Sequence, residues 1–77
     1  MDTYIATFFS HFGAIRFHKG LQERGVPAKM MPVPRKVSSS CGTCVRFESA
    51  EIPAPCDDVE TLYRIDGDAL AEVYTNL

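Results

Sequence analysis

The first 25 residues constrain the fold most, because an apolar strand pattern runs directly into a helix pattern. Thr3 to Phe9 is rich in β-branched and aromatic residues, which is typical of a buried strand. Ser10 is a good helix N-cap, and the amphipathic segment from about His11 to Arg24 is followed by Gly25, a residue suited to a left-handed helix end. The sequence therefore predicts a sheet with a helix on one of its faces.

The predicted helix carries apolar residues on two sides. One stripe should face the sheet, and it consists of Ala14, Phe17, His18 and Leu21. Phe12 and Ile15 point the other way. They are covered by a later segment, contact a second subunit, or are simply exposed, since single exposed apolar residues are common.

Two further segments complete a strand, helix, strand, strand order. Val26 to Val33 is the second predicted strand, and its prolines at 27 and 32 lack amide donors, which favours a sheet edge. Pro34 to Gly42 is then a loop. Thr43 to Glu48 alternates in polarity with the period of a half-buried strand, so Val45 and Phe47 should enter the core.

The last third of the sequence is harder to assign. Residues 49–58 contain Pro53 and Pro55 and should be irregular, although Pro55 suits the start of a short helical turn, and Val59 to Ile65 predicts a fourth strand. Beyond it, Asp66 and Gly67 would make a good two-residue turn into a final strand over residues 73–75. The alternative is a helix capped by Asp68, and we prefer it because four apolar residues have helical spacing: Leu70, Val73, Tyr74 and Leu77.

Size and charge exclude several classes of protein. A chain of 77 residues makes a single domain, residues 1–77, with a thin core and little room for a deep active-site cleft. The net charge of −2 and the scattered Lys and Arg residues argue against nucleic acid as a partner. The sequence has neither a long apolar run for a membrane span nor a basic and apolar leader, so we expect no membrane association and a cytoplasmic location.

Three cysteines, Cys41, Cys44 and Cys56, cannot all pair within one chain, and we expect free thiols in a reducing compartment. A zinc site would need a second closely spaced ligand pair, which the cysteines and two histidines do not supply, so no metal is predicted. The carboxylates resemble turn and cap residues more than an acid and base pair. An enzymatic activity is therefore left open, with a carrier preferred to a catalyst.

The loop around Cys41 is the one segment that suggests chemistry. Hydroxyl donors, an unhindered backbone, nearby positive charge and the start of the predicted helix would each favour thiolate over thiol. His11, in the first helical turn, is a candidate proton acceptor for this thiol. The supporting residues are Arg35, Lys36, Ser38, Ser39, Ser40 and Gly42.

Cys44 is a possible redox partner of Cys41. In an extended strand the two Cα atoms would be about 10 Å apart, beyond the roughly 7 Å limit for a disulfide, whereas a turn would bring them together. The simpler interpretation of Cys44 and Cys56 is that they are small buried core residues.

The run from Pro32 to Gly42, with its P-V-P-R and S-S-C-G elements, resembles the signature of the selenium/sulfur carrier protein-like family. The resemblance is good over about residues 4 to 48, and Tyr63, Arg64 and Ile65 resemble the last strand of that family. The chain departs from the family where Ile52 to Pro55 replaces a usual second helix. We therefore expect a small α+β sandwich, ferredoxin-like or sulfur-carrier-like, in which a fourth strand and a C-terminal helix or hairpin follow β-α-β-β.

The resemblance implies that Cys41 bears a persulfide or perselenide and passes it between donor and acceptor proteins, with no cofactor. Two alternatives remain open. The chain is a non-catalytic interaction domain, for example a homodimer through Phe12, Ile15 and the C-terminal segment, in which the cysteines only pack. A weaker option is a thiol–disulfide module that uses Cys41 and Cys44.

Overall fold

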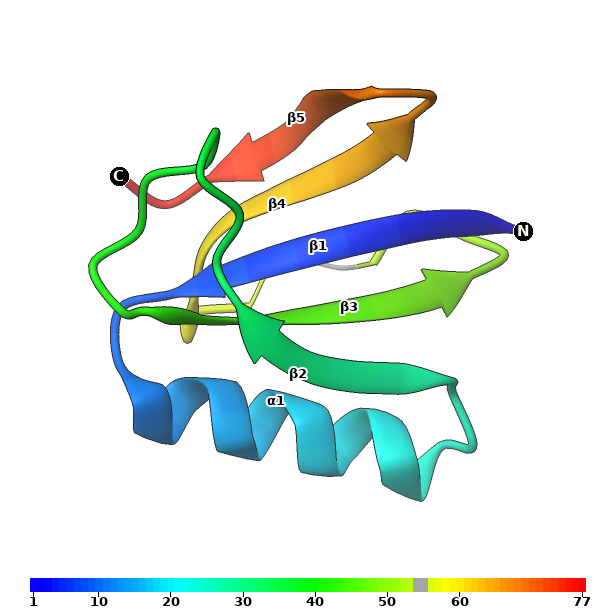
Figure 1. Cartoon of the computed structure of the whole chain (residues 1–77). Helices are drawn as coiled ribbons and strands as arrows, with labels where there is room; N and C mark the ends of the chain where they lie inside the picture. The colour runs from blue at the N-terminus through cyan, green and yellow to red at the C-terminus, as the bar shows by residue number, and fades with distance from the viewer. Residues whose placement is uncertain (54–55) are drawn as a thin grey trace.

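A computed structural model describes residues 1–53 and 56–77 of the chain (Figure 1). It contains one helix, α1 (His11–Glu23), and a five-stranded sheet. The helical turn expected at Pro55 falls outside the described residues. The strands are β1 (Asp2–Phe8), β2 (Ala28–Pro32), β3 (Thr43–Ser49), β4 (Val59–Asp66) and β5 (Ala69–Thr75).

The sheet has the order β2-β3-β1-β4-β5, and each neighbouring pair is antiparallel. The prolines predicted an edge position for the second strand, and β2 is indeed an edge strand. The helix packs on one face, against β1, β2 and β3 (Figure 1). The α+β prediction is confirmed, but α1 is the one helix among the described residues, so a complete ferredoxin-like topology is not established.

The junction of β1 with α1 follows the capping signals in the sequence. Ser10 is the N-cap, and its Oγ accepts a hydrogen bond of 3.2 Å from the amide of Gly13. At the other end Gly25 adopts a φ of +72°, which a residue with a side chain rarely adopts. The amide of Val26 then donates to the carbonyl of Leu21 at 2.9 Å, which turns the chain toward β2.

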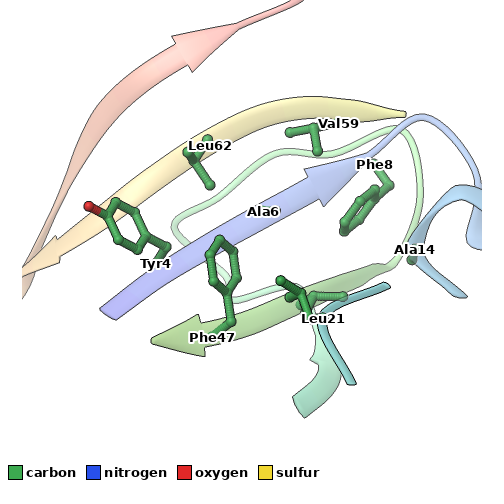
Figure 2. Close-up of a cluster of buried hydrophobic side chains, with 9 residues drawn as sticks. Tyr4, Ala6, Phe8, Ala14, Leu21, Phe47, Val59 and Leu62 are labelled. Atoms are coloured by element: carbon green, nitrogen blue, oxygen red, sulfur yellow. The ribbon is translucent and has the colours of Figure 1, made fainter. Parts of the chain in front are cut away.

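Aromatic rings fill the core between the sheet and α1. Phe47 lies at its centre, with ring centroids 5.5 Å from both Tyr4 and Phe17, while Phe8 lies 5.3 Å from Phe17. Figure 2 shows the side chains of Tyr4, Phe8 and Phe47 on the same side of the sheet as those of Ala14 and Leu21 from α1. Val45 and Phe47 are buried as the alternation predicted.

The preferred prediction of a C-terminal helix is wrong, because residues 69–75 form strand β5. Asp66 and Ala69 close the hairpin, and Gly67 has a φ of +61°. In the register, Leu62 pairs with Tyr74 and Tyr63 with Glu72, so Val73 is an extra residue. This bulge lets Val73 and Tyr74 both pack against the core, which produces the adjacent apolar pair that imitated a helical stripe.

The outer side of α1 is uncovered. Phe12 is 66% exposed and Ile15 is 45% exposed. The C-terminal segment pairs with β4 at the sheet edge opposite β2, so it does not supply the cover for these two residues that the sequence allowed.

Candidate functional site

The candidate site is the loop of residues 33–42 between β2 and β3, called here the Cys41 loop. Its ends are held together, because the amide of Val33 donates to the carbonyl of Gly42 at 3.1 Å and Pro32 pairs with Thr43 in the ladder. A second bond, from the amide of Val37 to the carbonyl of Pro34 at 3.0 Å, makes a turn inside the loop. A short loop with joined ends forms a compact unit on a rigid base.

The Cys41 loop packs onto the sheet face that α1 leaves free. The core cluster lies on the helix side of the sheet. Ile5 and Thr7 of β1 are buried but do not belong to that cluster, because alternate residues of a strand point to opposite faces. The loop contributes two buried apolar residues, Val37 and Cys41, which also lie outside that cluster. Figure 1 shows the loop leaving β2, passing over β1 and returning to β3 beside the start of α1.

Cys41 is only 9% exposed, so its thiol is largely covered. The neighbouring serines hold it there. Ser39 donates from Oγ to the carbonyl of Phe8 at 3.3 Å and accepts from the amide of Cys41 at 3.3 Å. Ser38 is exposed, and no side-chain hydrogen bond of Ser38 is found within the described part of the chain.

Ser40 binds a carboxylate that sequence analysis did not identify. Its amide lies 3.3 Å from both Oε1 and Oε2 of Glu60, and its hydroxyl donates to Oε2. Glu60 is an acidic residue that is only 2% exposed. The signal in the sequence is faint: Glu60 is an acidic residue between Val59 and Thr61, near the start of a predicted strand.

A bulge in β4 gives Glu60 this position. Thr7 pairs with Thr61 and Phe8 with Val59, so Glu60 has no partner of its own in β1. As a result Val59 and Leu62, three positions apart, both enter the core on the helix side, while Glu60 and Thr61 stay out of it. A regular alternation would not allow this arrangement.

The basic side chains that were predicted to support the Cys41 thiol lie at different places around the loop. His11 stands at its base, where Nδ1 makes a hydrogen bond of 3.1 Å with Oγ1 of Thr43. Lys36 donates from Nζ to the carbonyl of Asp68 at 2.6 Å, and Arg35 is exposed. The hydrogen bond of His11 thus goes to Thr43, the first residue of β3, and its role as a proton acceptor for Cys41 stays a prediction.

Cys44 occupies a different environment from Cys41. It is fully buried in β3, paired with Thr7 on one side and Met31 on the other. Its Sγ lies 3.7 Å from the carbonyl of Pro32 as a weak donor, and burial raises the pKa of this thiol above its ordinary value of 9.0. Both cysteines are free thiols, so no disulfide joins them.

Cys56 precedes β4 and packs on the helix side of the sheet. It is partly buried, packs against the core, and lines a cavity of about 510 Å³ between α1 and the connection from β3 to β4. Within residues 1–53 and 56–77, no group of three His, Cys, Asp or Glu side chains is placed to hold a metal ion. Across the same residues, no helix is long and apolar enough to cross a membrane.

Fold and site together define a small α+β protein that holds a free thiol in a closed loop on its sheet. The chain belongs to the family described as "Putative Se/S carrier protein-like", whose model matches residues 3–63. The match includes the whole Cys41 loop and Glu60, and it confirms the family resemblance noted in the sequence. Comparison with curated proteins and with solved structures finds no match.

Proposed function

We propose that the protein carries sulfur or selenium on Cys41, as a persulfide or perselenide, between a donor protein and an acceptor protein. Family membership over residues 3–63 is the observation that carries this proposal. The position of Cys41 supports it, because a loop can open without loss of the fold whereas a strand cannot. Cys44, locked in β3 with a raised pKa, is a poorer candidate for the same task.

The transfer is a balanced thiol exchange. The Cys41 thiolate attacks the terminal sulfur of a persulfide on the donor, a new S–S bond forms, and the donor thiolate leaves as its own S–S bond breaks. A nucleophile on the acceptor then attacks the terminal sulfur on Cys41, and the Cys41 thiolate leaves. For selenium, the terminal atom is the selenium of a perselenide. No electrons are gained or lost overall, so the carrier needs no cofactor.

Positive charge around the loop would favour the anionic states of this exchange. Arg35 and Lys36 lie within the Cys41 loop, and β1 passes into α1 beside Ser39. Exposed basic side chains and a helix start both favour a nearby anion. A reducing compartment such as the cytoplasm would keep the thiol available.

Persulfide loading of the intact chain tests this function. We would treat the protein with inorganic polysulfide and measure the mass gain of one sulfur atom by intact mass and peptide mapping. Loading should fall on Cys41 and be lost in Cys41→Ser, while Cys56→Ser should load normally. Loading that persists in Cys41→Ser would reject Cys41 as the carrier.

The second candidate is a non-catalytic interaction domain, and the uncovered side of α1 favours it. Phe12 and Ile15 lie one helical turn apart and are both exposed, which suits a protein contact or a homodimer. Sedimentation of the wild type and of Phe12→Ser over a range of concentrations would test it. A dimer that Phe12→Ser dissociates, in a protein whose Cys41 does not load, would favour this function over the carrier.

A further inference from the structure

Glu60 is the one charged residue that is buried among the residues the structure describes. A buried carboxylate is costly unless hydrogen bonds compensate for the lost water. Among residues 1–53 and 56–77, the donors to this carboxylate come from Ser40 alone, through its amide and its hydroxyl. Burial of this charge is therefore coupled to the position of the Cys41 loop.

The strand side of this contact is rigid. The carbonyl of Glu60 accepts from the amide of Asn76 at 2.8 Å and from Oγ1 of Thr75 at 3.2 Å, which ties the bulge to the end of β5. On the opposite side of β4, the amide and carbonyl of Thr61 both bond to Oγ1 of Thr7. The backbone of β4 at Glu60 is therefore held from both sides, and the Cys41 loop, which lies outside the ladder, is the side of the contact that we expect to move.

The contact between Glu60 and Ser40 holds the residue that precedes Cys41 in the sequence. Cys41 follows Ser40, and its own amide is held by Ser39. With 9% of Cys41 exposed, an incoming sulfur atom has little access to Sγ in this arrangement. A second sulfur atom on Cys41 would also need space, because closely packed side chains tolerate added atoms poorly.

We propose that Glu60 is a positioning residue for Cys41: its carboxylate holds Ser40 and keeps the adjacent thiol covered until a partner releases the loop. This inference rests on the proposed function in taking Cys41 as the transferring thiol. The donor or acceptor protein would open the site by competing for Ser40, and β4 would stay in place. Exposure of a reactive persulfide would then be confined to the docked complex.

The test measures the alkylation rate of each cysteine in the full folded chain with iodoacetamide. Glu60→Ala removes the acceptor, and we expect Cys41 to react roughly tenfold to a hundredfold faster, the range that loss of hydrogen bonds to a charged group predicts. Glu60→Gln keeps an amide oxygen that can accept from Ser40 and should give a smaller rise. Ser40→Ala should also give a smaller rise, and adding it to Glu60→Ala should change little.

Cys44 and Glu72 supply the matched controls. Cys44 becomes accessible when β3 leaves the sheet, so its rate reports general unfolding. Glu72→Ala removes an exposed carboxylate on β5 and should leave the Cys41 rate unchanged. An equal rise at Cys41 and Cys44 in Glu60→Ala, or no rise at Cys41 in either Glu60→Ala or Ser40→Ala, would overturn the inference.

Polysulfide loading of the same variants separates this inference from the carrier function. If Glu60→Ala speeds alkylation of Cys41 but Cys41 is never loaded, the positioning role stands and the carrier function fails. If wild type and Glu60→Ala are loaded and alkylated at equal rates, the carrier function stands and the positioning role fails.

Discussion

Replacement of Phe47 by Ala removes the ring at the centre of the core. Phe47 is 2% exposed, and its ring centroid lies 5.5 Å from those of Tyr4 on β1 and Phe17 on α1. It therefore joins the sheet to the helix. Neither neighbour can fill the space left behind, because each is fixed to a different element of the fold.

The expected cost is a large share of the total stability. A buried Phe→Ala change costs about 3–5 kcal/mol, which includes both lost burial and the cavity that remains. A domain of 77 residues is stabilised by about 4–12 kcal/mol in all, from about 0.05–0.15 kcal/mol per residue. For a cost near 4 kcal/mol, the melting temperature should fall by about 15–30 °C.

Urea denaturation at equilibrium measures this loss of stability. The labelling rates of Cys41 and Cys44 then show whether the loss exposes both cysteines equally. Phe47→Leu, which keeps most of the volume, should cost less than about 1.5 kcal/mol. Phe47→Ala should speed the labelling of Cys41 and Cys44 by similar factors, in contrast to the selective effect expected for Glu60. A loss below about 1.5 kcal/mol in Phe47→Ala would refute the assignment of this ring to the centre of the core.

Three further outcomes follow from single positions. Burial raises the pKa of Cys44 above its ordinary value of 9.0, so the unfolded chain releases this proton first. The contribution of this thiol to stability should be fully present well below pH 9.0 and be lost as the pH rises toward the folded pKa, and Cys44→Ala should remove that part of the alkaline loss in urea titrations. Ser10→Ala should cost about 1 kcal/mol in thermal unfolding through loss of the N-cap, and Ser10→Gly only a few tenths, so equal losses would contradict the capping role. Gly67→Ala forces a residue with a side chain to adopt a φ of +61° and should lower the stability by about 1 kcal/mol. Gly20→Ala, in the helix, should raise the stability slightly, and urea denaturation measures both changes.

The N-terminal half of the fold could be predicted because its signals are local. Ser10 and Gly25 mark the ends of α1 through backbone chemistry that does not depend on distant contacts. Pro32 at the end of β2 and Pro27 just before it favour an edge position because proline lacks an amide donor wherever it occurs. In β3, alternation placed Val45 and Phe47 correctly because both lie in a regular stretch of ladder.

The C-terminal element could not be predicted because its pattern depends on a bulge. Alternation alone would send Val73 and Tyr74 to opposite faces of a strand, whereas the register shift opposite Leu62 and Tyr63 lets both pack against the core. A helix explains the same pair of neighbours without any irregularity. Pairing with β4 decided the outcome, and that is a tertiary contact.

The sequence shows the residues of the candidate site but not how they are brought together. The Cys41 loop and its serines are contiguous in sequence, so they could be proposed together as a candidate site. Glu60 lies 20 positions beyond Ser40, and a second bulge turns it toward the loop. The sequence shows the residue but does not show which face of the sheet it will occupy.

Cys44 and Cys41 occupy different settings in the fold, one in a central strand and the other in a loop outside the ladder. Cys44 lies in β3 between two partner strands, so exposing it requires the separation of Thr7 and Met31 as well as the opening of the core. Cys41 lies outside the ladder, and opening its loop breaks contacts to Phe8 and Glu60 but none of the strand pairs. The free energy of opening is therefore lower for Cys41 than for Cys44, as is usual for loops relative to core strands. In the carrier function that we propose, a thiol on this loop would exchange its cargo while the sheet stays folded.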